Sequence, residues 1–254
     1  MTFSNSGRRP VRLASARRGT EDCGGAPKWK RVLDVSCVLA AAPLLLPLGL
    51  LVAVAIKVVS PGPVLFKQER VGYRGRRFTC LKFRSMRVNA DPSVHEGYFA
   101  ALMESDRPMV KLDAKGDERV IPGGIWLRSL GLDELPQVLN ILLGDMSLVG
   151  PRPCLPNEYE RYSVPHRRRM ETLPGLTGLW QVNGKNRTTF EEMIGLDVHY
   201  VDHRSLLLDI TILARTIPAI VVQVAEQRLL RKRASGAMAG EAAVDGNASC
   251  GRLS

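Results

Sequence analysis

The sequence predicts a membrane-associated α+β protein, and three of its features carry that prediction. Residues 35–56 form a run of 22 residues without a charged side chain, which is long enough to enter a bilayer. Residues 60–87 contain short β-like runs separated by turns rich in Gly and Pro. Apolar segments with helical spacing then alternate with polar loops up to residue 225. We therefore expect an N-terminal re-entrant membrane helix hairpin and a small cytoplasmic α/β domain with interfacial amphipathic helices.

Composition divides the chain into four segments. Residues 1–27 are rich in Ser, Gly, Arg and Ala without periodicity, so we expect a disordered basic tail, and it contains no apolar stretch typical of a signal peptide. Residues 28–59 are the expected membrane segment, and residues 60–225 are the expected folded domain. Residues 226–254 combine a basic run with an end rich in Ala, Gly and Ser, and we expect a second disordered tail there.

The net charge of +11 and a pI near 9.8 point to anionic partners, namely nucleic acid, phosphorylated substrates or an anionic membrane face. The chain has no Walker A, Gly-rich dinucleotide, helix-turn-helix or RNA-binding signature, so a nucleic-acid partner is not expected. Its cysteines lack ligand-like spacing and are expected to be reduced thiols in a cytosolic setting, with neither a disulfide nor a zinc site. They are Cys23, Cys37, Cys80, Cys154 and Cys250.

The membrane segment has two interpretations. As a straight helix the uncharged run measures about 33 Å, which would span a hydrocarbon core of roughly 30 Å. However, Pro43 and Pro47 lie in the middle of the run, where each removes a helical hydrogen bond. Both flanks are basic, with net charges of +6 over residues 1–31 and +8 over residues 57–87, which favours both ends on the cytoplasmic side. We therefore expect a re-entrant hairpin that breaks near Pro43, and a tilted spanning helix stays open as the alternative.

Two β-like runs, residues 64–67 and 78–83, predict a β-hairpin closed by the Gly-rich turn between them. The hairpin brings Lys82 and Arg84 near the expected membrane surface. Attraction to anionic headgroups, worth about 1 kcal/mol per cation near the surface, is the simpler interpretation for its other cations.

An adjacent pair of carboxylates, Asp133 and Glu134, lies between two leucines. The apolar series over residues 138–143 predicts a short buried helix, with Asp133 as its N-cap. Arg128 precedes the pair, and Arg152 follows it between two prolines that stiffen its backbone. A helix N-terminus and nearby arginines suit a bound phosphate. From these residues alone, a capped helix with surface ion pairs is the more economical interpretation.

Five motifs stand in order along residues 28–225. They are SPGPVLFKQERVG (60–72), FTCLKFRSM (78–86), LDELPQ (132–137), SLVGPRP (147–153) and PGLTGLWQV (174–182). Together they resemble the bacterial sugar transferase family, the small monotopic phosphoglycosyl transferases that act as polyprenyl-phosphate sugar-1-phosphate transferases. The resemblance also implies a membrane hairpin of the kind that the two prolines predict.

The resemblance implies an enzyme that moves a sugar-1-phosphate from a UDP-sugar to polyprenyl (undecaprenyl) phosphate and releases UMP. Such an enzyme would carry out the first membrane step of exopolysaccharide, capsule or glycan assembly. Its catalytic domain would lie on the cytoplasmic face of the inner membrane. The expected partners are the UDP-sugar, polyprenyl phosphate and membrane lipid, and downstream glycosyltransferases are possible ones.

The same resemblance assigns roles to the charged residues. Asp133 is the expected nucleophile, through a covalent phosphosugar intermediate. Glu134 would help to hold Mg²⁺, the expected cofactor, or orient the acceptor phosphate, and both carboxylates are candidate metal ligands. The expected phosphate-binding cations are Lys82, Arg84, Arg128, Arg152 and Lys185. Family members commonly have Arg where this chain has Lys185, which replaces a bidentate contact by a point charge.

Two rival functions remain open. A membrane-tethered adaptor that binds anionic lipid or nucleic acid without catalysis explains the charge and the apolar run. It does not explain the pairing of the LDELPQ and GPRP motifs. A metal-dependent phosphohydrolase would use the same carboxylates, with water as the acceptor.

Two segments outside the motifs carry expectations of structure only. Residues 166–169, with the sequence HRRR, are expected to form a solvated basic face. Residues 205–224 are strongly apolar and are expected to form an interfacial helix that Pro218 interrupts.

Overall fold

The structure is a computed structural model that describes residues 26–88, 97, 101–103, 105, 107–109, 119–185 and 187–225. The expected tails, residues 1–27 and 226–254, therefore lie almost entirely outside the described residues. Helices, short 3-10 turns and strands alternate along the described chain, which confirms a mixed helix and sheet protein. In chain order they are α1 (Lys28–Val59), β1 (Leu65–Val71), η1 (Tyr73–Gly75), β2 (Arg77–Phe83), α3 (Gly124–Leu130), η3 (Leu132–Glu134), α4 (Gln137–Leu143), β3 (Ser147–Val149), α5 (Pro156–Glu160), α6 (Val164–Arg167), η4 (Arg168–Met170), β4 (Gly175–Thr177), α7 (Leu179–Val182), α8 (Phe190–His203) and the last helix, Leu206–Ala225.

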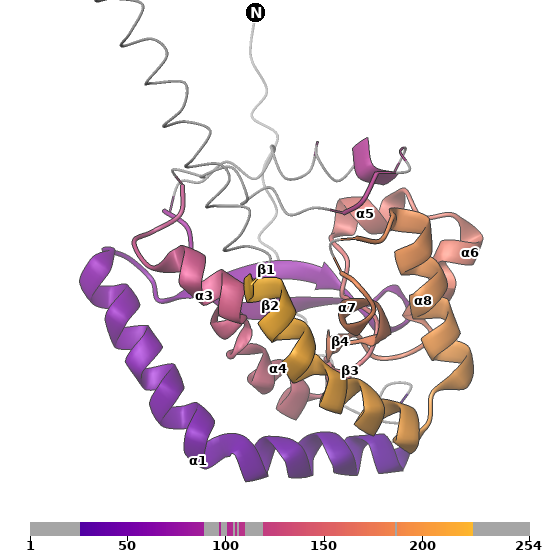
Figure 1. Ribbon diagram of the computed structural model, residues 1–254, viewed down its shortest axis with the longest axis horizontal. Coiled ribbons are helices and arrows are strands. Elements are labelled where there is room, and N and C mark those ends of the chain that lie inside the picture. The colour runs from indigo at the N-terminus through magenta and orange to yellow at the C-terminus, as the bar shows by residue number, and fades with distance from the viewer. Residues whose placement is uncertain are drawn as a thin grey trace, which may run out of the picture.

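Helix α1 bends sharply. It runs along the lower edge of the molecule in Figure 1 and then turns to continue up the left side. Both Pro43 and Pro47 lie inside it, and a proline removes one backbone hydrogen bond and favours a kink. By length and composition, α1 and the last helix are each apolar enough to cross a membrane. Helix α1 is therefore bent but unbroken from Lys28 to Val59, whereas we expected a break near Pro43.

The N-terminal part of α1 is fixed to the rest of the chain by buried polar contacts. Lys30 Nζ lies 2.5 Å from Asp209 Oδ2 and 2.9 Å from the Tyr200 hydroxyl. Asp34 Oδ1 accepts hydrogen bonds from the Ser147 hydroxyl and the Leu148 backbone N–H, both at 3.0 Å. Because buried charges are stable only when they are paired, these contacts set the position of α1 against β3 and the last helix.

Strands β1 and β2 form the expected antiparallel hairpin, longer than predicted, with register from Leu65 opposite Phe83 to Val71 opposite Arg77. The turn that joins them uses positive φ at Arg74 and Gly75. A side chain at Gly75 would also meet the Tyr159 hydroxyl at 2.6 Å, so glycine suits this turn for two reasons.

A second, two-stranded sheet joins two of the sequence motifs. Strand β3 pairs in parallel with β4, with Ser147 opposite Gly175. The backbones approach closely here, because a Cβ atom added at Gly150 or Gly175 would collide with the backbone of the facing segment. The SLVGPRP and PGLTGLWQV motifs therefore form one packed unit.

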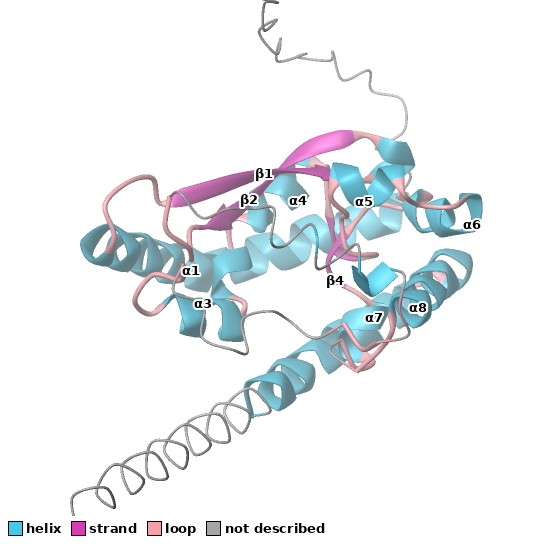
Figure 2. Cartoon of the chain, turned by 90° about the horizontal axis from the view of Figure 1, so that it is seen from above, coloured by secondary structure: helices cyan, strands magenta, loops and turns pink. Residues whose placement is uncertain are grey.

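The last helix is continuous, so the expectation that Pro218 interrupts it is wrong. Its inner side is held by packing, since Ile212 is fully buried against Val149, Leu179 and Tyr200. One lost hydrogen bond bends a helix without ending it when tertiary contacts hold the segment. Figure 2 shows this helix running obliquely away from α7 and α8.

Candidate active site

The carboxylate pair lies in a tight turn between two short helices. Helix α3 ends at Leu130, and its C-cap Gly131 has a left-handed φ of 70°. The turn η3 then carries Asp133 and Glu134. The N-cap of α4 is Pro136, with no side-chain cap hydrogen bond. The expectation that Asp133 caps this helix is therefore wrong, because the positive φ at Gly131 inserts a separate turn before α4.

Helix α4 forms where expected, but only one of its sides is buried. Ile141 and Asn140 are fully covered, whereas Leu139, Leu142 and Leu143 are exposed. Asn140 accepts a hydrogen bond from the Leu81 N–H at 3.0 Å and donates one to the Thr79 carbonyl at 2.8 Å. This side chain joins α4 to β2 and so fixes the carboxylate turn beside Lys82.

Lys82 contacts the carboxylate pair directly. Its Nζ lies 3.0 Å from Glu134 Oε1, and both side chains are partly exposed. The Lys82–Glu134 ion pair is therefore partly exposed to solvent. An incoming anion can approach Lys82 while this ion pair keeps part of its hydration.

Lys185 and Arg152 complete a group of five charges. Desolvation of the Lys185 ammonium lowers its pKa. The negative charges of Glu134 and Asp133 raise this pKa, and the positive charges of Lys82 and Arg152 lower it further. Charges act on one another in this way only over short distances in protein. The structure thus places Lys82 in contact with Glu134, and Lys185 lies within electrostatic reach of Lys82, Asp133, Glu134 and Arg152.

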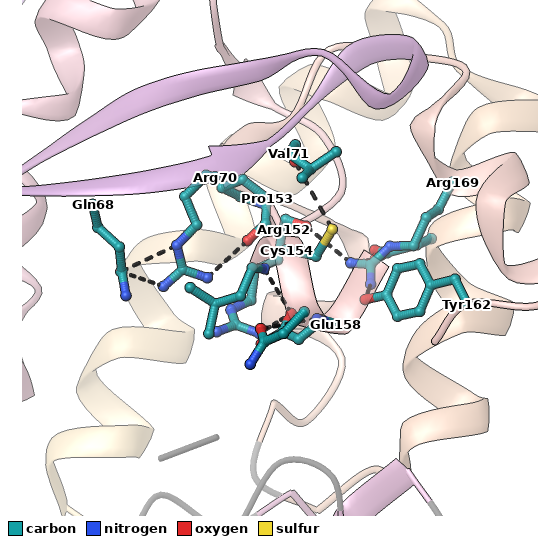
Figure 3. A network of polar contacts seen from close by, with 12 residues as sticks. Gln68, Arg70, Val71, Arg152, Pro153, Cys154, Glu158, Tyr162 and Arg169 are labelled. Atoms are coloured by element: carbon teal, nitrogen blue, oxygen red, sulfur yellow. Dashed lines mark hydrogen bonds and ion pairs between the residues drawn. The ribbon is translucent and has the colours of Figure 1, made fainter. Parts of the chain in front are cut away.

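The loop that carries Arg152 is held from both sides, as Figure 3 shows. Arg70, which is buried, donates to the Pro153 carbonyl at 3.1 Å. Arg169 donates to the Arg152 carbonyl at 3.1 Å. The Arg152 guanidinium itself lies 3.9 Å from the buried carboxylate of Glu158. The backbone and the side chain of Arg152 are therefore both positioned by neighbouring charged residues.

The expectation of a solvated basic face over residues 166–169 is wrong for Arg169. This side chain is 1% exposed, donates to the Tyr162 hydroxyl at 2.9 Å and forms an ion pair with Asp197. Burial lowers the pKa of Arg169, but the adjacent Asp197 outweighs this effect and holds it above the usual range. Because Asp197 on α8 pairs with it, Arg169 lies in the interior and supports the Arg152 loop.

Arg84, one of the expected phosphate-binding residues, contacts the end of the membrane segment. It is buried and donates to the Ser60 carbonyl at 2.6 Å and to the Pro61 carbonyl at 2.8 Å, in the turn that follows α1. Its two terminal guanidinium nitrogens thus hold the turn that follows α1. Arg128 lies in the last turn of α3, which leads directly into the carboxylate turn.

Asp133 and Glu134 are the candidate ligands of the expected Mg²⁺. Within the described part of the chain, no group of three or more His, Cys, Asp or Glu side chains could hold a metal. Asp133 and Glu134 are two carboxylates, and Mg²⁺ is commonly bound by one or two carboxylates together with substrate phosphates. These two carboxylates therefore suit a Mg²⁺ ion whose remaining ligands include oxygens of a bound pyrophosphate. The three cysteines in this part of the chain, Cys37, Cys80 and Cys154, are free thiols.

A family model described as bacterial sugar transferase matches residues 26–223, which is most of the chain. The chain belongs to the bacterial sugar transferase family. The exopolysaccharide production protein ExoY of Sinorhizobium fredii is 42% identical over 193 residues, covering 75% of this chain and 84% of that protein. The UDP-glucose:undecaprenyl-phosphate glucose-1-phosphate transferase of Caulobacter vibrioides is 41% identical over 200 residues, covering 76% of this chain and 69% of that protein.

A third member of the family has a different sugar in its name. The undecaprenyl-phosphate galactose phosphotransferase of Salmonella typhimurium is 36% identical over 202 residues, which cover 76% of this chain and 40% of that protein. The match to this sugar transferase family confirms the resemblance carried by the five motifs and the interpretation of the chain as an enzyme. The names of these relatives differ in the sugar, so they leave the sugar of this chain open.

Proposed function

We propose that this protein transfers a sugar-1-phosphate from a UDP-sugar to polyprenyl (undecaprenyl) phosphate and releases UMP. The observation that carries the proposal is the carboxylate pair Asp133 and Glu134 with Lys82, Arg152 and Lys185 around it. A pyrophosphate is heavily anionic, so a carboxylate can approach it only where cations neutralise the phosphate oxygens. This group of charges meets that requirement.

The proposed chemistry has two steps. In the first, a carboxylate oxygen of Asp133 attacks the phosphorus that carries the sugar, and the bond from that phosphorus to the bridging oxygen of UMP breaks. The products are UMP and a phosphosugar bound to Asp133 as an acyl phosphate. In the second, an oxygen of polyprenyl phosphate attacks the same phosphorus, which forms the lipid diphosphate sugar and restores the Asp133 carboxylate.

The neighbouring side chains have separate roles in this scheme. Glu134, held by Lys82 at 3.0 Å, orients the incoming phosphate and supplies a second carboxylate for Mg²⁺. Arg152, with its backbone fixed by Arg70 and Arg169, and Lys185 bind the phosphate oxygens. When bound, Mg²⁺ would supply further neutralisation of the pyrophosphate charge.

The membrane arrangement is also part of the proposal. Helix α1 would enter the cytoplasmic leaflet, turn at Pro43 and Pro47, and return to the same side. Several large side chains of α1 are exposed in the structure, among them Leu44, Leu46, Leu50 and Leu51. An apolar surface of this size is unusual on a soluble protein and is suited to lipid. The active site would then face the cytoplasm at the inner membrane, where a soluble donor and a lipid acceptor both reach it.

The proposal is tested by UMP release from purified full-length protein, with a panel of UDP-sugars, Mg²⁺ and undecaprenyl phosphate in detergent. We expect sustained UMP release with at least one UDP-sugar, and only when the lipid phosphate is present. Sustained release without the lipid would indicate the phosphohydrolase instead. No release with any donor, from folded protein that still binds anionic vesicles, would indicate the adaptor.

A further inference from the structure

A cavity of about 370 Å³ lies between a first segment, residues 181–185 with Arg187, and the last helix, Leu206–Ala225. Three cations border it: Lys185 and Arg187 from the first segment, and Arg215 from the helix. Its volume falls in the range of small-molecule sites. Three cations around one cavity favour an anionic occupant. Both substrates of the proposed reaction are phosphate esters, so they are anions of this kind.

The remaining walls of the cavity combine apolar residues with two glutamines, Gln181 and Gln223. Val182 contributes from one side, and Ala219 and Val222 contribute from the last helix. Beyond the cavity the same helix exposes Ile217 and Val221, which are 71% and 63% exposed. The apolar wall therefore continues onto a surface suited to lipid. An occupant with an anionic head and a hydrocarbon chain matches this combination better than a nucleotide does.

Lys185 connects the cavity to the candidate active site. It borders the cavity, and its pKa responds to the charges of Glu134, Lys82, Arg152 and Asp133. A phosphate bound beside Lys185 would thus lie within electrostatic reach of the carboxylates.

The wall that carries Arg215 is firmly positioned. The hydroxyl of Thr216 lies 2.9 Å from that of Thr177, which belongs to β4. One turn earlier Ile212 is buried in the core, and Asp209 forms its ion pair with Lys30. The guanidinium of Arg215 is therefore presented from a fixed element of the fold.

We propose that this cavity holds the head of the lipid acceptor. The acceptor phosphate would bind Lys185, Arg187 and Arg215, and the first isoprenoid units would lie along Ala219 and Val222 towards the membrane. This inference rests on the proposed function, since it assigns the acceptor of that reaction to a place in the fold.

The test compares donor and acceptor kinetics in Arg215→Gln and Ala219→Trp, which remove a charge and fill the cavity. We expect each variant to raise the KM for undecaprenyl phosphate about tenfold or more, because a charge-assisted contact or the space itself is lost. The KM for the UDP-sugar and the rate of adduct formation on Asp133 without lipid should stay at the wild-type level. Arg215→Lys should restore part of the acceptor affinity.

Arg161→Gln is the matched control, because it removes an exposed charge at the C-cap of α5, outside the cavity. A higher KM for the UDP-sugar with unchanged acceptor kinetics would overturn the proposal and make the cavity a nucleotide site. Unchanged kinetics for both substrates in both variants would also overturn it. If wild-type protein released no UMP, the proposed function would fail, and weaker binding of Arg215→Gln to nanodiscs containing undecaprenyl phosphate would still test the cavity separately.

Discussion

Lys82 Nζ lies 3.0 Å from Glu134 Oε1, so a strand and a turn that are 52 residues apart in the chain meet as one ion pair at the candidate active site. We predict that Lys82→Met and Glu134→Gln each lower kcat/KM by roughly 10²-fold, the scale for one electrostatic group at a reacting centre. The double variant should lose much less than the product of the two factors, because the residues act as a unit. The measurement is a double-mutant cycle on UMP release. Fully multiplicative losses would mean that the pair has no joint role.

The buried pair Lys30 and Asp209 should contribute to stability rather than directly to chemistry. Both side chains are fully buried, so Lys30→Met leaves the Asp209 carboxylate in the interior without its cation, with the Tyr200 hydroxyl still donating to it. We predict a loss of about 3–5 kcal/mol in the free energy of unfolding. Adding Asp209→Leu should recover part of that loss, because the uncompensated charge is then gone. Thermal unfolding in detergent measures the stability of the single and the double variant. A Lys30→Met protein as stable as wild type would contradict the stabilising role of the ion pair.

Lys185 should set the alkaline limit of activity. Desolvation lowers its pKa below that of an ordinary lysine, with Glu134 and Asp133 opposing the shift and Lys82 and Arg152 adding to it. The charged form that binds phosphate is present below this lowered pKa and is lost as pH rises through it. Lys185→Arg keeps its charge, so we predict that the alkaline limb of the kcat/KM profile moves to higher pH. A limb at the same pH in both proteins would show that another group titrates there.

The topology of α1 can be tested in cells. In a background without the native cysteines, Thr20→Cys and Ser60→Cys report on the two ends of the membrane segment. We predict that an impermeant thiol reagent labels neither position from outside intact cells and labels both after lysis. The Pro43→Ala, Pro47→Ala double variant should straighten α1 and shift the protein towards spanning. Labelling of only one position in wild type would establish a spanning helix instead.

The local elements of this fold were predictable because their signals are local. Turn residues bracket the β1–β2 hairpin, and a run without charges precedes Lys57 at the end of α1. A threonine followed three residues later by a glutamate marks the start of α8, where Thr189 and Glu192 form the capping box. Each of these patterns lies within or directly beside the element that it predicts.

The supporting contacts of the site were not predictable in this way. Arg169 looks like one cation of a surface run, and only Asp197, 28 residues later, makes it a buried support of the Arg152 loop. Lys30 pairs with Asp209, which lies 179 residues later in the chain. Arg84 stands in a family motif, yet its contacts lie with the carbonyls after α1. Pairings over such separations depend on how the elements pack, and no local pattern encodes them.

The proposed reaction passes through a phosphosugar on Asp133. Intact mass spectrometry of the full-length protein, mixed with the active UDP-sugar and Mg²⁺ but no lipid, tests it most directly. We predict a mass increase of one sugar phosphate, which disappears when undecaprenyl phosphate is added and never forms in Asp133→Asn. An unmodified mass for wild-type protein, together with kinetics that require both substrates to be bound at once, would contradict the covalent route and leave Asp133 as a metal ligand only.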